Sequence, residues 1–244
     1  NTGDDYIVGG IGADTIDGGA GTDEIDYSTD AGAGGDAGVT VDLAAGTAID
    51  GFGAQDQLTN IENITGTDQT DQLTGSDAAN AIQANAGDDV IAGLGGADTI
   101  DGGIGTDEID YSTDAAAGGD AGVTVDLSAG TATDGFGAQD QLTNIEDVTG
   151  TDETDVITGD SGANVLSGIG GEDTVYGGAG ADLIDGGSGD DRLFGGEGAD
   201  QIAGNTGDDT IVGGIGADAI DGGAGSDEID YSTDAAAGGD AGVT

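Results

Sequence analysis

The amino-acid sequence predicts an all-β protein in which short parallel strands stack as successive coils of a β-solenoid. The nine-residue pattern Gly-Gly-x-Gly-x-Asp-x-(Ile/Leu/Val)-x, seen in residues 177–185, recurs along most of the chain. A period of nine fits neither an α-helix nor a long strand, so each unit must contain a turn of six residues followed by three extended residues. Two units then complete one coil, and stacked coils place two parallel sheets face to face.

The eighth position of every unit carries Ile, Leu or Val. Because the middle side chain of a three-residue strand points to one face of its sheet, we expect this position to be buried in every unit. The residues at this position are Ile7, Ile16, Ile25, Leu73, Ile82, Ile91, Ile100, Ile109, Ile157, Leu166, Val175, Ile184, Leu193, Ile202, Ile211, Ile220 and Ile229.

Aligned by nines, the chain separates into arrays of repeats and closely similar spacers. The arrays span residues 1–26, 66–110 and 150–230, the spacers span 27–65 and 111–149, and residues 231–244 begin a third spacer. Residues 205–244 repeat residues 1–40 with four differences, a spacing of 204 residues. We therefore expect a longer parent protein in which the first array and the last spacer are parts of larger copies.

The spacers contain strand and turn signals of their own. In the first spacer, residues 39–43 alternate apolar and polar side chains, which predicts a strand with one buried face, and Gly51-Phe52-Gly53 predicts a turn. Ile64 lies nine places before the first aliphatic residue of the next array, and the second spacer repeats all of these features. We expect the spacers to be divergent coils or a hairpin that caps the stack. A tyrosine follows each array, and we expect it to cover the end of the stack: Tyr27, Tyr111 and Tyr231.

Charge restricts the possible partners. The chain has 51 acidic residues and one basic residue, Arg192, so its formal net charge is −50. Repulsion on this scale opposes a compact state unless cations neutralise the acids. The same charge repels phosphates and anionic lipids, which excludes nucleic acids and membrane surfaces as partners. No apolar run approaches the roughly 20 residues of a membrane span.

The residue types that are missing exclude much of enzyme chemistry. The sequence contains no Cys, His or Lys, so zinc sites, nucleophile–histidine pairs and Schiff bases are excluded. Paired acids such as Asp4-Asp5 could indicate a glycosidase, but they recur with the repeat and no apolar pocket is indicated. We expect no catalytic site, and we expect Arg192 to be an exposed charge at the flank of a strand.

The turns have the chemistry of a calcium site. Calcium prefers six to eight hard oxygen ligands and accepts both carboxylates and backbone carbonyls. A glycine-rich turn that ends in Asp offers both kinds of oxygen, and stacking at about 4.8 Å brings two such turns together. Two half-sites would then make one site.

The repeat Gly9-Gly10-Ile11-Gly12-Ala13-Asp14-Thr15-Ile16-Asp17 and its copies resemble the RTX, or haemolysin-type, calcium-binding nonapeptide. The spacer pattern Gly-Val-Thr-Val-Asp-Leu, followed by Leu-Thr-Asn-Ile-Glu, resembles segments of large secreted RTX proteins. The resemblance implies a parallel β-roll with several calcium ions between consecutive turns, type I secretion, and folding outside the bacterial cell.

Carried onto this sequence, the resemblance assigns calcium binding to the sixth residue of each full repeat. These residues are Asp5, Asp14, Asp23, Asp89, Asp98, Asp107, Asp173, Asp182, Asp191, Asp200, Asp209, Asp218 and Asp227. Four units lose the inner glycines, and we expect weak or absent ion sites at their sixth residues, Asp71, Asn80, Asp155 and Asn164.

Three functions fit these observations. The first is a calcium-stiffened structural segment at the cell surface, such as an adhesin stalk, a surface-layer element or a filament that self-associates. The second is the secretion tail of an extracellular hydrolase, a protease or lipase whose catalytic domain lies outside this chain. The third, ice binding, needs a regular Thr or Asn ladder, and the third and fifth repeat positions are too variable to form one. We favour the first function.

Overall fold

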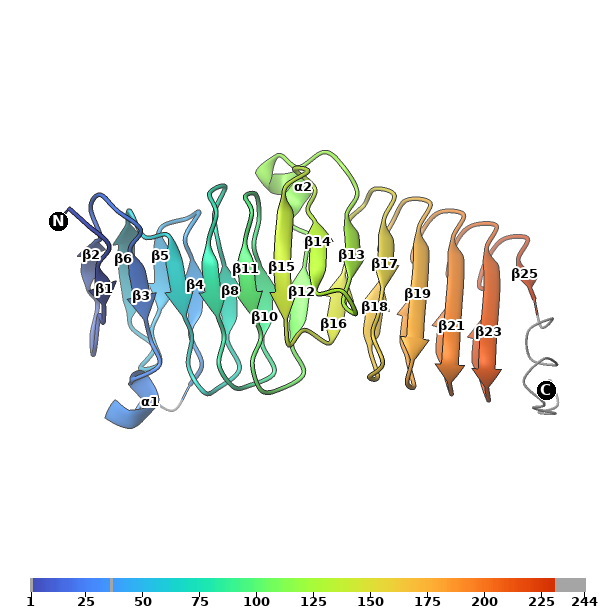
Figure 1. Cartoon of the computed structure of the whole chain (residues 1–244), viewed down its shortest axis with the longest axis horizontal. Helices are drawn as coiled ribbons and strands as arrows, with labels where there is room; N and C mark the ends of the chain where they lie inside the picture. The colour runs from blue at the N-terminus through green and yellow to red at the C-terminus, as the bar shows by residue number, and fades with distance from the viewer. Residues whose placement is uncertain (1, 36, 231–244) are drawn as a thin grey trace. The chain divides into compact units, whose positions relative to one another are not determined.

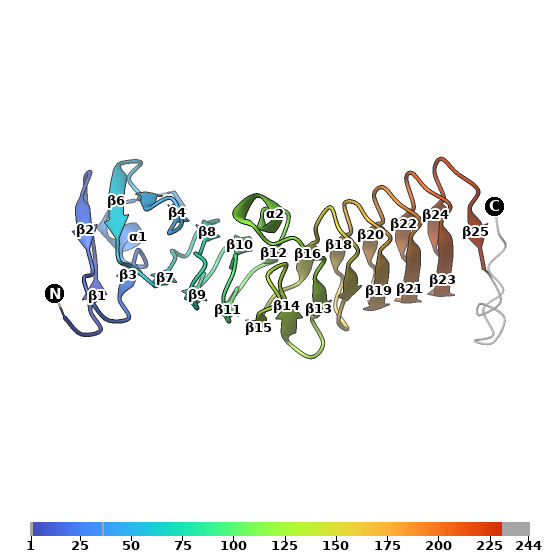
Figure 2. The ribbon, with the colours of Figure 1, turned by 90° about the horizontal axis from the view of Figure 1, so that it is seen from above.

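The computed structural model describes residues 2–35 and 37–230, which form two compact units. Unit 1 consists of Asn1–Asp110 and Ala138–Ile145, and unit 2 consists of Tyr111–Gly137 and Glu146–Thr244. The third spacer at 231–244, with Tyr231, lies outside the described residues. Figures 1 and 2 show that each unit is built of short strands in two layers, joined by turns.

Unit 1 contains two sheets of short strands. In order of neighbours, the first sheet contains β1 (Tyr6–Ile7), β3 (Glu24–Asp26), β7 (Asn63–Thr65), β9 (Ala81–Gln83), β11 (Thr99–Asp101) and β15 (Gln139–Thr143). The second contains β2 (Thr15–Asp17), β6 (Gln55–Thr59), β5 (Thr47–Ile49), β4 (Thr40–Asp42), β8 (Gln72–Thr74), β10 (Val90–Ala92) and β12 (Glu108–Asp110). One short helix, α1 (Asp30–Ala33), follows β3.

Unit 2 has the same construction. Its first sheet contains β14 (Thr131–Thr133), β13 (Thr124–Asp126), β17 (Val156–Thr158), β19 (Thr174–Ala179), β21 (Arg192–Gly198), β23 (Thr210–Gly216) and β25 (Glu228–Ile229). Its second sheet contains β16 (Asp147–Thr149), β18 (Val165–Ser167), β20 (Leu183–Asp185), β22 (Gln201–Ala203) and β24 (Ala219–Asp221). A short helix, α2 (Asp114–Ala117), belongs to the second spacer.

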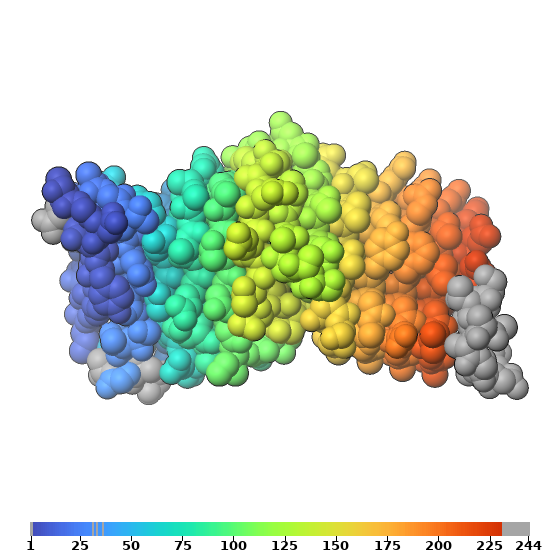
Figure 3. All heavy atoms as spheres, viewed as in Figure 1, coloured from blue at the N-terminus to red at the C-terminus, as the bar shows by residue number. Residues whose placement is uncertain are grey.

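The register confirms the predicted coil of two repeats. Within the arrays, strands pair in parallel at an offset of eighteen residues, as in Val175 with Leu193 and Ile184 with Ile202. Figure 3 shows the yellow to red coils of unit 2 lying directly against one another. Each coil therefore contacts mainly its two neighbours, as in other repeat proteins.

The aliphatic eighth positions form the core of each unit. Ile25, Leu73 and Ile100 in unit 1 are fully buried, as are Val175 and Ile184 in unit 2. The prediction that this position is buried in every unit is wrong for three residues, which are half-buried because each lies in the first or last described strand of its sheet. These residues are Ile7, Ile220 and Ile229.

Three strands of the third array are longer than the predicted three residues. β19, β21 and β23 continue into the following turn because Gly178 pairs with Gly196, and Gly196 with Gly214, in the same parallel register. On that side of unit 2 the turn backbone is part of the sheet. The opposite turns contribute only isolated bridges, such as Ser188 with Thr206.

The first spacer is inserted within a sheet and does not cap the stack. β4, β5 and β6 form an antiparallel meander, as a hairpin prediction requires. The outer edges of this meander pair in parallel with β2 and β8. Both edges are therefore hydrogen-bonded, and the ladder continues through the spacer. The predicted turn is also present, with the N–H of Gly53 donating to the carbonyl of Asp50 at 2.9 Å.

Tyr27 does not cover an end of the stack, contrary to the prediction. It follows β3, which lies between β1 and β7, and its side chain is buried. Its hydroxyl donates to Oδ2 of Asp56 at 3.1 Å. Tyr111 is buried as well. Burial of a tyrosine requires a partner for its hydroxyl, and Asp56 provides one for Tyr27.

Candidate metal sites

The sixth-position acids form columns along each unit. In unit 2, the N–H of Asp173 donates to Oδ1 of Asp191 at 2.9 Å, and the N–H of Asp191 donates to Oδ1 of Asp209 at 2.9 Å. The bond recurs from Asp155 to Asp173 and from Asp209 to Asp227, and in the other row of turns from Asn164 to Asp182, Asp182 to Asp200 and Asp200 to Asp218. Each carboxylate is therefore fixed by the coil that precedes it.

Unit 1 places its sixth-position acids in the same way. The bond runs from Asp5 to Asp23, from Asp71 to Asp89, from Asp89 to Asp107 and from Asn80 to Asp98. Three array acids donate to spacer acids: the N–H of Asp14 donates to Asp56 at 2.9 Å, that of Asp23 to Glu62 at 2.8 Å, and that of Asp98 to Asp140 at 3.0 Å. All thirteen predicted residues thus belong to columns of stacked acids.

The second carboxylate oxygen in these columns is buried without a protein partner. Among the described residues, Oδ2 is buried and accepts no hydrogen bond at nine sixth-position acids: Asp5, Asp14, Asp23, Asp89, Asp173, Asp182, Asp191, Asp200 and Asp209. A buried ionised oxygen without a partner is costly, and native proteins rarely leave one. The recurrence of this atom at one repeat position makes the turn a candidate ligand site.

At several of these turns, a backbone carbonyl of the next coil lies near the same point as Oδ2. A Cβ added to Gly195 would lie within 3 Å of both Oδ2 of Asp200 and the carbonyl oxygen of Gly213. A Cβ at Gly204 would meet Oδ2 of Asp209 and the carbonyl of Gly222 in the same way. At these two turns, a side chain on the first glycine would therefore meet both a carboxylate and the carbonyl of the next coil.

Burial shifts the protonation of these acids. Desolvation raises the pKa of Asp89 and of Asp173 from 3.8 to about 7, and that of Asp191 to about 6. Neighbouring carboxylates raise them further, while the hydrogen bond from the preceding coil lowers them. Desolvation also raises the pKa of Asp182, Asp200 and Asp209. A cation beside Oδ2 would favour the charged form and oppose this shift.

The available ligands are those that calcium prefers. They are hard oxygens, and the charged ligands are carboxylates fixed in orientation by a backbone N–H. Over residues 2–35 and 37–230, no group of three or more His, Cys, Asp or Glu side chains is arranged to hold a metal ion. A cation in these turns would therefore need backbone carbonyls as well as carboxylates, and Ca²⁺ accepts this mixture.

Comparison of the sequence with models of protein families identifies the repeat. The model of the RTX calcium-binding nonapeptide repeat (4 copies) matches residues 1–36, 74–109, 149–184, 167–202 and 194–229, more than half of the chain. The chain belongs to the RTX calcium-binding nonapeptide repeat family. A search of curated proteins gives no match. RTX repeats bind calcium and are typical of secreted bacterial proteins, and the described part of the chain contains no helix long and apolar enough to span a membrane.

In the RTX units that lack the inner glycines, the sixth-position side chains make hydrogen bonds to neighbouring protein groups. In the unit at residues 66–74, Oδ2 of Asp71 accepts the N–H of Thr67 at 2.6 Å, and Oδ1 accepts the Thr67 hydroxyl at 2.8 Å. Asp155 and Thr151 repeat these contacts. At Asn80, the side-chain amide donates to the carbonyl of Glu62 at 2.6 Å. A side-chain oxygen that already accepts protein hydrogen bonds has less need of a cation, which agrees with the expectation of weak or absent sites in these units.

In the first spacer, two residues take the place of repeat acids, and the sequence pattern did not single them out. Asp56 accepts the N–H of Asp14, and Glu62 accepts the N–H of Asp23 at 2.8 Å. Each lies two residues before a stacked aliphatic residue, Leu58 or Ile64, which is the spacing of positions six and eight in the repeat. That acid-x-aliphatic spacing is the signal by which the sequence could have revealed them.

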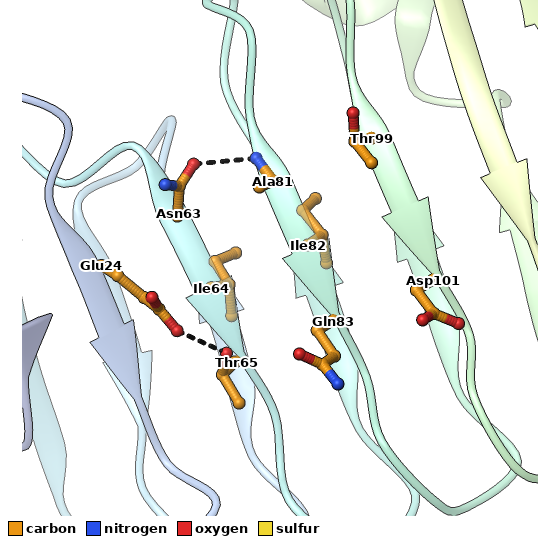
Figure 4. Close-up of a pocket in the computed structure, with 9 residues that line it drawn as sticks. All are labelled: Glu24, Asn63, Ile64, Thr65, Ala81, Ile82, Gln83, Thr99 and Asp101. Carbon is orange, nitrogen blue, oxygen red and sulfur yellow. Dashed lines mark hydrogen bonds between the residues drawn. The ribbon is translucent and has the colours of Figure 1, made fainter.

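The outer face of the RTX strands bears polar ladders. A shallow pocket in unit 1 is lined by side chains of β3, β7, β9 and β11 (Figure 4). There the hydroxyl of Thr65 donates to Oε1 of Glu24 at 2.6 Å, and the N–H of Ala81 donates to Oδ1 of Asn63 at 2.8 Å. These bonds tie neighbouring coils together on the solvent side. In unit 2 the same face carries the stacked rings of Tyr176 and Phe194, with centroids 4.8 Å apart.

Proposed function

We propose that this chain is a calcium-dependent structural segment of an extracellular bacterial protein, such as an adhesin stalk, a surface-layer element or a filament. In this proposal the chain folds when it meets calcium after type I secretion. The observation that carries the proposal is the row of buried Oδ2 atoms at position six, nine of which have no protein partner in the described residues. The sixth-position acids named from the sequence are the proposed calcium ligands, together with carbonyls of the adjoining turns.

Electrostatics supports coupling between calcium and folding. The chain has a formal charge of −50, so stacking of the coils brings many negatively charged carboxylates close to one another. Many of these carboxylates lie buried in columns. Divalent ions between the turns would offset both the repulsion and the desolvation of these oxygens. Since the unfolded chain has no preformed site, the free energy of ion binding becomes free energy of folding.

The repeat architecture supports a structural role. Each coil is held by its two neighbours through parallel ladders and a column of buried aliphatic residues. Such stacks lengthen by adding identical coils, and their stability is close to the sum of nearest-neighbour terms. Extracellular calcium modules bind with dissociation constants of roughly 10⁻⁴–10⁻³ M. Scarce calcium inside the cell would then keep the chain unfolded for export.

Limited proteolysis at controlled free calcium tests this function. At about 10⁻³ M calcium, within the affinity range of extracellular modules, we expect the chain to resist a protease such as proteinase K. At free calcium well below that range we expect rapid digestion throughout. Equal resistance at both calcium concentrations would refute calcium-gated folding after export.

A further inference from the structure

The regular repeats of unit 2 define what one complete set of oxygens looks like. In the turn that begins at Gly186, the N–H of Gly186 donates to the carbonyl of Ala203 at 2.9 Å. The next residue in that neighbouring coil is Gly204. If Gly186 carried a Cβ, the carbonyl oxygen of Gly204 would lie 3.2 Å from it. Oδ2 of Asp191 lies within 3 Å of the same Cβ position. A carboxylate and a carbonyl from the following coil therefore converge beside the first glycine.

The last turn of the first array has the same surroundings, although the coil that follows it belongs to the spacer. The N–H of Gly18 donates to the carbonyl of Thr59 at 3.1 Å. A Cβ on Gly18 would lie within 3 Å of both Oδ2 of Asp23 and the carbonyl oxygen of Asn60. Thr59 and Asn60 therefore occupy the positions that Ala203 and Gly204 occupy in the regular repeat.

Asn60 is held in the conformation that this arrangement needs. Its φ is 51°, in the left-handed region that asparagine tolerates better than most residues. Its side-chain amide donates to Oδ1 of Asp17 at 2.8 Å, which fixes the residue. Two residues later, Glu62 accepts the N–H of Asp23 as a sixth-position acid would. The spacer turn therefore has a left-handed residue near its start, Asn60, and an acid at its end, Glu62, as a repeat turn does. It lacks the glycine-rich residues between them.

Asp23 has an oxygen that requires a partner. The residue is 0% exposed, and its Oδ2 is buried and accepts no hydrogen bond. Its Oδ1 is occupied by the N–H of Asp5 at 2.7 Å. We propose that Asp23 Oδ2 and the Asn60 carbonyl form a calcium site that joins the repeat array to the spacer, with Glu62 positioning the Asp23 backbone. This inference rests on the proposed function, because it extends calcium binding from paired repeats to a repeat paired with a spacer.

The second array ends in the same geometry. A Cβ on Gly102 would lie within 3 Å of Oδ2 of Asp107 and of the Asn144 carbonyl. Asn144 also has a φ of 51°, and its amide donates to Oδ1 of Asp101 at 2.8 Å. Two separate copies of one arrangement show that the spacer sequence builds it reproducibly.

The junction at Gly9, where the first array meets the first spacer in the second sheet, is built differently. A Cβ on Gly9 would lie 3.5 Å from Oδ2 of Asp56 and 3.7 Å from Oδ2 of Asp14, and its nearest neighbour would be Ile16 at 3.1 Å. No carbonyl is among these three neighbours, and Asp56 Oδ2 already accepts the Tyr27 hydroxyl. We therefore place the junction site at Asp23 and Asn60 and not at Asp56.

Counting bound calcium in isosteric variants tests the junction site. Native mass spectrometry of the calcium-loaded chain is compared for Asp23→Asn, for Asp182→Asn in a regular repeat, and for the exposed Asp68→Asn as a charge-matched control. We expect one ion fewer than the unaltered chain in each of the first two variants and an unchanged count in the control. Asparagine already occupies position six at Asn80 and Asn164, so the stack accepts it.

The outcomes separate this inference from the proposed function. If Asp23→Asn keeps the full count while Asp182→Asn loses one ion, the junction site is wrong and calcium binding by paired repeats stands. If Asp182→Asn also keeps the full count, the proposed function is wrong too. Should Asp23→Asn fail to fold, crystals of the unaltered chain grown in calcium decide. An anomalous peak about 2.3–2.6 Å from both Asp23 Oδ2 and the Asn60 carbonyl supports the site, and its absence beside occupied regular turns overturns it.

Discussion

Asp182 donates its backbone N–H to Oδ1 of Asp200 at 3.0 Å, eighteen residues later, while its own Oδ2 is buried without a protein partner. One oxygen of a sixth-position carboxylate such as Asp182 thus holds the stack by accepting the N–H of Asn164, and the other is presented to the turn. This division explains why the repeat requires an acid and not merely a hydrogen-bond acceptor. An asparagine would meet the structural need, and a cation in the turn would give the second oxygen a partner.

Asp182→Asn should therefore change stability in opposite directions with and without calcium. The amide keeps an acceptor for the N–H of Asn164, which lies at 2.9 Å, and removes a buried charge. Without calcium we expect the variant to be no less stable than the unaltered chain. At calcium about tenfold above the dissociation constant, we expect a loss of about 1.4 kcal/mol, the linkage free energy of one site. Urea unfolding in calcium, and in calcium-free buffer at pH 5 where β-structure is expected to persist, measures this, and an equal effect in both would contradict the account.

Stability without calcium should fall as pH rises. The folded-state pKa of Asp89 and Asp173 is raised by burial from 3.8 to about 7. Between about pH 4 and pH 7 the folded state then binds more protons than the unfolded state, so the free energy of unfolding decreases as pH increases through this window. In calcium-free buffer we expect more β-structure at pH 5 than at pH 8, measured by circular dichroism.

Saturating calcium should abolish or reverse that pH dependence. A cation favours the ionised carboxylates and lowers their pKa, and protons then compete with the ion for the same oxygens. Stability in calcium is expected to be higher at pH 8 than at pH 5. A stability curve that falls with pH to the same extent in calcium would show that these acids do not bind the ion.

Gly195→Ala should destabilise the calcium-loaded chain. The added Cβ would lie within 3 Å of Asp200 Oδ2 and of the Gly213 carbonyl, which must then separate. We expect a cost of about 1–3 kcal/mol from overpacking, together with a weaker calcium affinity. Gly32→Ala is the control, since open space surrounds Gly32 and the second spacer carries Ala116 at the corresponding position. Thermal unfolding in calcium compares the two, and equal melting temperatures would contradict the role given to the first glycine.

Tyr27→Phe removes the donor that satisfies Asp56. The two groups form a buried hydrogen bond of 3.1 Å, and Oδ2 of Asp56 would be left without this donor. We expect a loss of about 1–3 kcal/mol in urea unfolding. Tyr6→Phe is the matched control because Tyr6 is 64% exposed, and it should be neutral. If both substitutions have the same effect, the spacer does not depend on this bond.

The repeat pattern predicted those features of the fold that depend on the nine-residue period. The eighteen-residue coil, the two parallel sheets and the buried residues such as Ile184 follow from a nine-residue phase, and the structure confirms them. The turns are left-handed at the second glycine of the repeat, with φ of 106° at Gly178 and 79° at Asn85, where asparagine replaces this glycine. Local sequence and fold agree at these positions.

The spacers could not be placed from periodicity because they interrupt it. Insertion of β4, β5 and β6 within a sheet depends on pairing with β2 and β8, which are distant in sequence. The short helix α1 was not predicted, since four residues carry no helical period. Asp56 and Glu62 were missed because they lack the flanking glycines. Their role arises from stacking on Asp14 and Asp23.

Circular dichroism of the chain with excess calcium and after addition of EDTA tests the central claim most directly. With calcium we expect a β-sheet spectrum, and with EDTA at neutral pH we expect a spectrum of unfolded chain that returns to β-sheet when calcium is restored. Undiminished β-structure in EDTA would contradict the claim that calcium at the sixth-position carboxylates holds the coils together.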